Sequence, residues 1–218
     1  KNIDLFIFFI SIFLSLLAVF INNLRWYVII RKLKKIEFKI LFKHSYIISF
    51  LNQILPSTIG GEAYKIYITK ITISSLPKSI SITFLEKYFV LMTLLFLIII
   101  SNYFYNDLTL SWISNLMNLF TIIFISLIIF FILIFKFTEI KVGNQIFIKF
   151  KILVENSTQY LKDIKLLLLV FGISLLSHIL LLFIFTLSSL SLGIELDIFE
   201  ISYIFFIIFL FSQLPISL

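Results

Sequence analysis

The 218-residue chain contains no cysteine, which excludes disulfides and thiolate metal sites. It has only two histidines, and it shows neither a phosphate-loop pattern nor a paired His–Glu spacing. Charged residues make up 13% of the chain, about half of what a soluble domain carries. These absences leave no motif for nucleotide binding, metal binding or hydrolysis. We therefore expect no cofactor and no metal, and the chain contains no recognisable catalytic constellation, which favours a protein that is not an enzyme by itself.

Apolar residues are what the chain has in abundance. Hydrophobic residues account for 61% of it, including 28 phenylalanines, and a soluble domain does not bury that much apolar surface. The apolar runs are long and unbroken, whereas a transmembrane β-barrel requires short alternating segments. The sequence therefore predicts an all-α fold, a polytopic transmembrane helical bundle.

The positive charge is concentrated in two parts of the chain. The net charge is +7, and most of the eighteen Lys and Arg residues lie in 25–43 and 136–165. Loops of this kind are typical of the cytoplasmic side, where they face anionic lipid headgroups. We therefore expect a multi-pass protein of the cell (cytoplasmic) membrane that binds no nucleic acid.

Six apolar runs can be compared with the ~20 residues that a spanning helix requires. They lie at about 5–24, 40–56, 82–101, 117–135, 166–190 and 199–218. If 40–56 crossed the membrane, Lys65, Lys70 and Lys78 would lie outside, and the loop 102–116, which has no Lys or Arg, would lie inside. If 40–56 enters and returns, every loop lies on its expected side.

Loop charge therefore predicts re-entrant hemi-helices within the bundle. The first is 40–61, which enters from the cytoplasmic face, and the second is 199–214, which enters from the outside. Full spans are predicted near 5–24, 82–101, 117–135 and 166–187.

The two re-entrant segments end in similar residues. Gln53 is followed closely by Pro56 and Ser57, and Gln213 is followed closely by Pro215 and Ser217. Two such breaks that approach from opposite faces indicate an inverted repeat around a midplane site. The alternative is chance similarity in a sequence of strongly biased composition.

The first break, FLNQILPSTIGGEAYKIYITK at 50–70, has the features of an anion site. Pro56 ends a helix, and Gly60–Gly61 permit a tight reversal. A helix that resumes at Glu62 would present the free amides of Gly61, Glu62 and Ala63, with Lys65 one turn further on. The alternative is a simple turn followed by a Glu62–Lys65 charge pair on an interfacial helix.

Three other groups of polar residues are candidates for the same site or for the membrane interface. Glu86–Lys87 is either part of it or an anchor at the cytoplasmic interface. Arg25–Trp26–Tyr27 is interpreted as an interfacial anchor first and a headgroup contact second. His178 lies within an apolar run, where we expect a neutral histidine bonded to Ser174 or to a neighbouring helix and leave it out of the site.

At these residues the sequence resembles the lysylphosphatidylglycerol synthase transmembrane region, also called the flippase-like membrane domain. The resemblance rests on N-x-x-L-P-S-T-I-G-G-E-A-Y-K at 52–65, Arg25–Trp26–Tyr27, Glu86–Lys87 and the terminal L-P-I-S-L. Lys65 and Lys87 stand where the family usually has Arg, which keeps the charge and loses bidentate phosphate geometry. The resemblance implies one incomplete flippase-like domain over 1–218, truncated at its C-terminus. Its lipid or anion site would comprise Asn52, Pro56, Gly60, Gly61, Glu62, Lys65, Glu86, Lys87, Pro215 and Ser217.

The resemblance also implies a function and two rivals. The expected function is translocation of a phospholipid or a polyprenyl-linked lipid across a bacterial or archaeal membrane. The first rival is the membrane half of a lipid-modifying transferase, either lysylphosphatidylglycerol synthase-like or associated with glycosyl transfer, with a separate or missing transferase as its partner. The second rival is a structural or assembly subunit.

Overall fold

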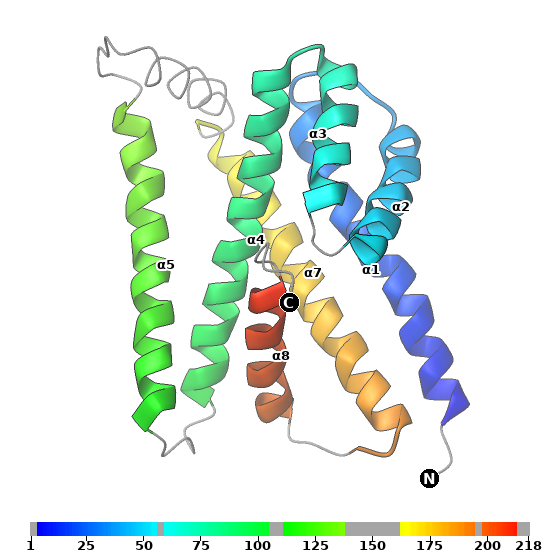
Figure 1. The fold of residues 1–218 in the computed structure, drawn as a ribbon, viewed down its shortest axis with the longest axis vertical. Helices are drawn as coiled ribbons and strands as arrows, with labels where there is room; N and C mark the ends of the chain where they lie inside the picture. Colours follow the sequence, from blue (N-terminus) through cyan, green and yellow to red (C-terminus); the bar gives the residue numbers. More distant parts are fainter. Residues whose placement is uncertain (1–3, 56–58, 105–110, 138–161, 195–197, 213–218) are drawn as a thin grey trace.

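The computed structural model describes residues 4–55, 59–104, 111–137, 162–194 and 198–212, and all regular structure in these ranges is helical. This confirms the predicted all-α class. The helices are α1 (Leu5–Arg31), α2 (Phe38–Ile54), α3 (Ile59–Ile73), α4 (Leu76–Phe104), α5 (Ser111–Phe137), α7 (Ile164–Ser191) and α8 (Ile198–Ser212). Figure 1 shows α1, α4, α5 and α7 as long helices and α2, α3 and α8 as short ones.

Three of the described helices are long and apolar enough to cross a membrane, namely α1, α4 and α7. Each has 27 or more residues, which corresponds to roughly 40 Å against a hydrocarbon core of about 30 Å. The predicted spans 5–24, 82–101 and 166–187 lie within these helices. The fourth predicted span, 117–135, lies within α5, whose described apolar segment is the shorter Asn118–Phe130. The coarse prediction of a multi-pass helical protein is thus supported.

Among the described helices, α1 and α7 pack against each other most extensively, and they run antiparallel. At one end Asp4 N donates to Ser191 O at 2.9 Å, and at the other end Lys32 Nζ donates to Asp163 Oδ2 at 2.5 Å. Asp163 also caps α7 by accepting from Leu166 N. The hydrogen bond from Lys32 holds the pKa of Asp163 below its usual range. The pair is therefore tied at both ends.

Helices α2 and α3 form a short antiparallel hairpin against α1 and α4. They have 17 and 15 residues, or about 25 Å and 22 Å, which is less than a membrane core. The hairpin begins and ends at the same end of the bundle, because Lys34 Nζ donates to Thr72 O at 2.6 Å. In Figure 1 the neighbouring ends of α2 and α3 lie partway along the long helices, and α8 extends from the opposite end to a similar height.

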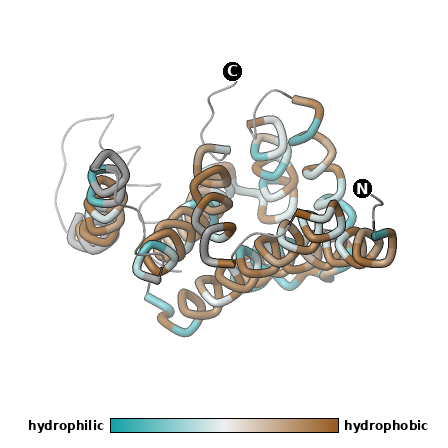
Figure 2. Tube along the Cα trace, turned by 90° about the horizontal axis from the view of Figure 1, so that it is seen from below, coloured by the Kyte–Doolittle hydropathy of each residue, from teal (hydrophilic) through white to brown (hydrophobic). Residues whose placement is uncertain are grey.

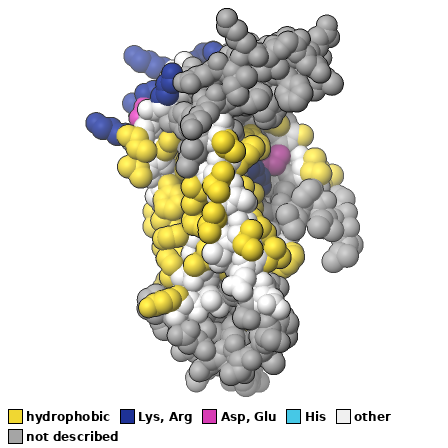
Figure 3. All heavy atoms as spheres, turned by 90° about the vertical axis from the view of Figure 1, so that its left-hand side faces the viewer, with side chains coloured by type: hydrophobic (Ala, Val, Ile, Leu, Met, Phe, Trp, Pro, Cys, Tyr) yellow, Lys and Arg dark blue, Asp and Glu magenta, His cyan; other side chains and the backbone are white. Residues whose placement is uncertain are grey.

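Positive charge is collected at the end of the bundle where the hairpin starts. The described Lys and Arg residues there include Arg31, Lys32, Lys34, Lys35, Lys39, Lys70, Lys78, Lys162 and Lys165. Figure 3 shows Lys and Arg side chains gathered at this end above a hydrophobic belt, and a few charged side chains in a hollow of that belt. Figure 2 shows hydrophobic residues along every helix. This segregation agrees with the predicted distribution of loop charge.

Two clusters of buried apolar side chains pack the helices against one another. The first joins α1, α2, α4 and α7 through Trp26, Ile29, Leu41, Ile82 and Val170. The second joins α4, α5 and α8 through Leu94, Ile98, Phe120 and Phe206. Helix α5 lies at the edge of the bundle against α4. Helix α4 takes part in both clusters and is therefore the centre of the fold.

Candidate functional site

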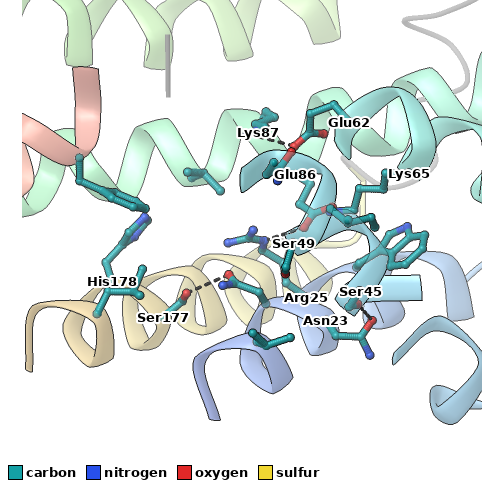
Figure 4. A pocket seen from close by; sticks show the side chains of 18 residues that line it. Asn23, Arg25, Ser45, Ser49, Glu62, Lys65, Glu86, Lys87, Ser177 and His178 are labelled. Atoms are coloured by element: carbon teal, nitrogen blue, oxygen red, sulfur yellow. Dashed lines mark hydrogen bonds and ion pairs between the residues drawn. The ribbon is translucent and has the colours of Figure 1, made fainter. Parts of the chain in front are cut away.

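A polar cavity of about 210 Å³ lies between α1, α2, α3, α4, α7 and α8. It is unusual in a chain of this composition, because most of its lining carries hydrogen-bonding groups or charge (Figure 4). The lining residues are Val19, Asn22, Asn23, Arg25, Trp26, Ser45, Ile48, Ser49, Asn52, Glu62, Lys65, Glu86, Lys87, Val90, Ser177, His178, Leu181 and Phe209. Polar groups inside a membrane-embedded bundle mark functional sites by default.

The deepest charged group of the cavity is Glu86 on α4, whose carboxylate is shared by two cations. Arg25 Nε lies 3.0 Å from Oε1, and Lys65 Nζ lies 2.6 Å from Oε2. The side chains of Arg25, Lys65 and Glu86 are only 9%, 11% and 3% exposed. A buried carboxylate remains ionised only when it is paired in this way. The three residues therefore form one ionic unit that joins α1, α3 and α4.

Lys65 is held from a second side by the aromatic ring of Trp26. Its Nζ lies 5.3 Å from the ring centroid, within the range of a cation–π interaction. The indole Nε1 of Trp26 donates to Thr69 Oγ1 at 3.1 Å, and Thr69 donates in turn to Lys65 O. The ring is therefore fixed in place by the helix that carries Lys65. Arg25 is fixed similarly by donating from Nη1 to Ser174 Oγ at 3.4 Å.

A second ion pair lies nearer the outside of the cavity. Lys87 Nζ is 3.0 Å from Glu62 Oε1, and the two side chains are 32% and 22% exposed. The other carboxylate oxygen, Glu62 Oε2, is buried without a hydrogen-bond partner among the described residues. Because this pair is more solvated than the Glu86 unit, it costs less to separate. We call it the outer pair.

The ion pairs differ from those suggested by sequence spacing. A Glu62–Lys65 charge pair was the alternative to the predicted anion site, and Glu86–Lys87 was predicted to be either part of that site or an anchor; the structure pairs Glu62 with Lys87 and Lys65 with Glu86. Adjacent residues on a helix point in different directions, so Glu86 and Lys87 face different partners on α3. Two ion pairs therefore join α3 to α4, and neither pair is formed between residues of the same helix.

The cavity contains three cations, Arg25, Lys65 and Lys87, and two carboxylates, Glu62 and Glu86. Its net charge at pH 7 is therefore +1. In a medium of low dielectric constant an uncompensated charge is costly, and a bound anion would neutralise it. The described lining thus has the electrostatic character of an anion site.

Gly60 and Gly61 lie in the first turn of α3, not in the reversal itself as predicted. Helix α3 begins at Ile59, three residues earlier than expected, so the amide of Ala63 is not among the four free amides at its start. Both glycines instead allow α3 to lie close to the end of α2. A Cβ on Gly61 would overlap the side chain of Asn52, and one on Gly60 would overlap Leu55.

Gly61→Ala is expected to lower stability by about 1–3 kcal/mol, because the added Cβ would overlap the side-chain amide of Asn52 and force it out of its place between α2 and α3. Gly172→Ala is the matched control, since a Cβ there meets nothing within 4 Å. Thermal unfolding of the two purified variants in detergent is the measurement. Equal melting temperatures for both variants would show that the α2–α3 contact does not depend on Gly61.

The remaining polar lining is neutral and comes mainly from α1, α2 and α7. Ser45 Oγ donates to Asn23 Oδ1 at 2.5 Å, and Ser177 Oγ donates to Asn22 Oδ1 at 2.9 Å. His178 Nδ1 lies 3.0 Å from Thr93 Oγ1 on α4. His178 therefore bonds to a neighbouring helix, which is one of the two arrangements predicted for it.

Most of the predicted site residues that the structure describes meet at this cavity. Asn52, Glu62, Lys65, Glu86 and Lys87 line it, and Gly60 and Gly61 shape the helix contact beside it. Pro56, Pro215 and Ser217 lie outside the described residues. Arg25, which was predicted to be chiefly an anchor, and His178, which the predicted site did not include, both line the cavity. Their position in otherwise apolar helices was the available signal.

Comparison with known families gives a match over the whole chain. The family model described as "Lysylphosphatidylglycerol synthase TM region" matches residues 1–218. The chain belongs to this family. No curated protein and no solved structure matches it. As a member of the lysylphosphatidylglycerol synthase transmembrane-region family, the chain is a membrane protein region, consistent with its apolar helices.

Proposed function

We propose that the protein binds the phosphate-bearing headgroup of a membrane lipid in this cavity and carries it across the cytoplasmic membrane. The observation that carries the proposal is the cavity with its three cations and net charge of +1, enclosed by six helices of a membrane bundle. Phosphates are bound in proteins by such cations. The lipid is a phospholipid or a polyprenyl-linked lipid.

The size of the cavity supports a headgroup as the bound part. Sites for drug-sized ligands have volumes of about 300–1,000 Å³, and this cavity, at about 210 Å³, is smaller. Acyl or polyprenyl chains would therefore remain outside, among the apolar side chains of the belt in Figure 3. The partly exposed outer pair, Glu62 and Lys87, would lie where the headgroup enters.

The short helices support a route for the headgroup. We infer that α2 and α3 form a re-entrant hairpin whose helices meet at membrane depth, and that α8 is its counterpart from the other face. Irregular backbone at that depth is tolerated where it lines a polar cavity. Two such elements related by an inverted repeat would allow the halves of the bundle to rock around a fixed site. The basic end would face the cytoplasm.

Transport by the purified protein tests this proposal. Phosphatidylcholine vesicles are prepared with and without the protein, with trace phosphatidylglycerol that carries a fluorescent group on one acyl chain. A membrane-impermeant reductant then bleaches only the outer leaflet. We expect faster loss of the protected fluorescence in protein-containing vesicles. Equal rates with and without folded protein, for this lipid and for a polyprenyl phosphate analogue, would contradict the proposal.

A further inference from the structure

The lining of the cavity changes from polar to apolar at a similar depth on three long helices. On α1, α4 and α7 the lining residue farthest from the basic end is aliphatic, namely Val19, Val90 and Leu181. Every other lining residue of these three helices carries a polar group. At 1.5 Å per residue, Val19 lies roughly 9 Å beyond Arg25, and Val90 lies roughly 6 Å beyond Glu86. An apolar layer therefore bounds the cavity on the side away from the basic end.

Helix α8 adds an aromatic ring to this layer. Phe209 is the described residue that α8 contributes to the lining. Its ring packs edge to face against His178, with the centroids 5.6 Å apart, and stacks on Phe205 at 5.8 Å. In Figure 4 His178 lies at the opposite end of the cavity from Lys65. Although His178 lines the cavity, it is only 2% exposed, because Phe209 covers it on this side.

An apolar layer of this kind is a barrier to a phosphate. A charged group that enters such a layer loses its hydration and finds no hydrogen-bonding partner, which is costly. The layer lies between the cations of the cavity and the far face of the membrane. A headgroup bound at Lys65 and Lys87 therefore leaves toward that face only when the layer opens.

Phe209 lies on the element of the layer that is best placed to move. The other three residues belong to α1, α4 and α7, of which α1 and α7 are tied together at both ends and α4 takes part in both apolar clusters. Helix α8 is short and is held near its start, where Ser202 Oγ donates to Ser101 Oγ at 3.1 Å. Phe209 lies roughly 10 Å further along the helix. A tilt of α8 about its start would therefore displace Phe209 most.

We propose that Phe209 is a gate that closes the cavity toward the face of the membrane opposite the basic end. Displacement of its ring from His178 opens the route for a headgroup to that face, and the structure is the state closed on this side. This inference rests on the proposed function and assigns one barrier of the transport route to one side chain. The alternative role of Phe209 is packing of α8 alone, in which case its removal leaves the cavity closed.

Thiol labelling from one face of the membrane tests the gate without any lipid substrate. The chain has no cysteine, so Ser49→Cys provides a unique thiol in the cavity lining. Leu192→Cys and Ser74→Cys mark the two ends of the bundle, because Leu192 is 49% exposed after α7 and Ser74 is exposed between α3 and α4. A charged, membrane-impermeant thiosulfonate is applied to intact cells and to inverted membrane vesicles. The preparation that labels Leu192→Cys and spares Ser74→Cys presents the face opposite the basic end.

In that preparation the Ser49→Cys thiol is expected to react slowly while Phe209 is present. Adding Phe209→Ala should raise the rate roughly tenfold or more, because the apolar cover is removed. Phe209→Leu, which keeps a branched apolar side chain, should give a smaller increase. Ile208→Ala is the matched control, since Ile208 is 59% exposed on the same helix and lies outside the lining, and it should leave the rate unchanged.

Two results would overturn the gate. Rapid labelling of Ser49→Cys from this face with Phe209 in place would show that the cavity is open there. Equal rates in the Phe209→Ala and Ile208→Ala backgrounds would show that Phe209 does not close it. Thermal unfolding in detergent, together with continued protection of Ser74→Cys in the Phe209→Ala background, distinguishes opening of a gate from loss of the fold.

The gate and the proposed function can fail separately. Lipid transport in the vesicle assay with no effect of Phe209→Ala on labelling would retain the function and remove the gate. Labelling that depends on Phe209 without lipid transport would retain the gate and contradict a lipid as the transported molecule.

Discussion

Replacing Glu86 by glutamine is expected to destabilise the protein by about 3–5 kcal/mol, the largest stability loss of any single conservative change at the site. Glutamine preserves the shape of the side chain and removes its charge. Arg25 and Lys65, both nearly buried, would then lie close to each other without a counter-charge. Helices α1 and α3, which carry these two cations, would repel each other at this point. Thermal unfolding in detergent measures the loss.

The chain offers a matched control and a partial rescue for this experiment. Glu37→Gln makes the same chemical change at an exposed position that caps α2 without a side-chain hydrogen bond, and we expect it to unfold like the wild type. Adding Lys65→Met to Glu86→Gln removes one excess cation and should recover part of the lost stability. If Glu86→Gln unfolds at the same temperature as Glu37→Gln, the carboxylate does not hold the helices together.

Replacing either Lys65 or Lys87 by methionine is expected to reduce lipid transport at least tenfold. Each change lowers the net charge of the cavity from +1 to zero, so that an anion no longer gains from entering it. Methionine keeps most of the length of the side chain, which limits the loss of packing. Lys70→Met is the control, because Lys70 is exposed on the same helix as Lys65 and lies outside the cavity lining.

Neutralising Glu62 is expected to have the opposite effect on headgroup binding from neutralising Lys65 or Lys87. The Glu62 carboxylate pairs with Lys87 and so competes with an incoming phosphate for that cation. Glu62→Gln is therefore expected to strengthen headgroup binding and to slow transport, because release becomes slower. Vesicle transport and calorimetric titration of the same variants provide both readouts. Normal transport by all three variants, Lys65→Met, Lys87→Met and Glu62→Gln, would exclude the cavity from the route.

Much of the helical framework was predictable because hydropathy and loop charge are local properties. Runs of about twenty apolar residues identified α1, α4 and α7. The distribution of Lys and Arg indicated that 40–56 does not cross, and the short α2–α3 hairpin is consistent with that prediction. The cluster of polar residues at 52–65 pointed to the cavity for the same reason, since charged groups in apolar segments are conspicuous.

The ion pairs could not be predicted, because they depend on how separate helices pack. Spacing along one helix favours Glu62 with Lys65, and it contains no information about the rotation of α4 against α3. That rotation turns Glu86 toward Arg25 and Lys65 and turns Lys87 toward Glu62. The hydrogen bond between His178 and Thr93 was also hidden, since the two residues are 85 positions apart in the sequence.

The absence of cysteine from the chain allows the central claim to be tested at a single atom. Ser49→Cys places a unique thiol in the cavity lining, and Ser74→Cys places one at the exposed turn between α3 and α4. The rate of modification by a charged thiosulfonate reagent is measured with and without dihexanoyl phosphatidylglycerol. If the cavity binds lipid headgroups, the lipid slows modification at position 49 and leaves position 74 unchanged. Unchanged rates at both positions under saturating lipid would contradict headgroup binding in this cavity.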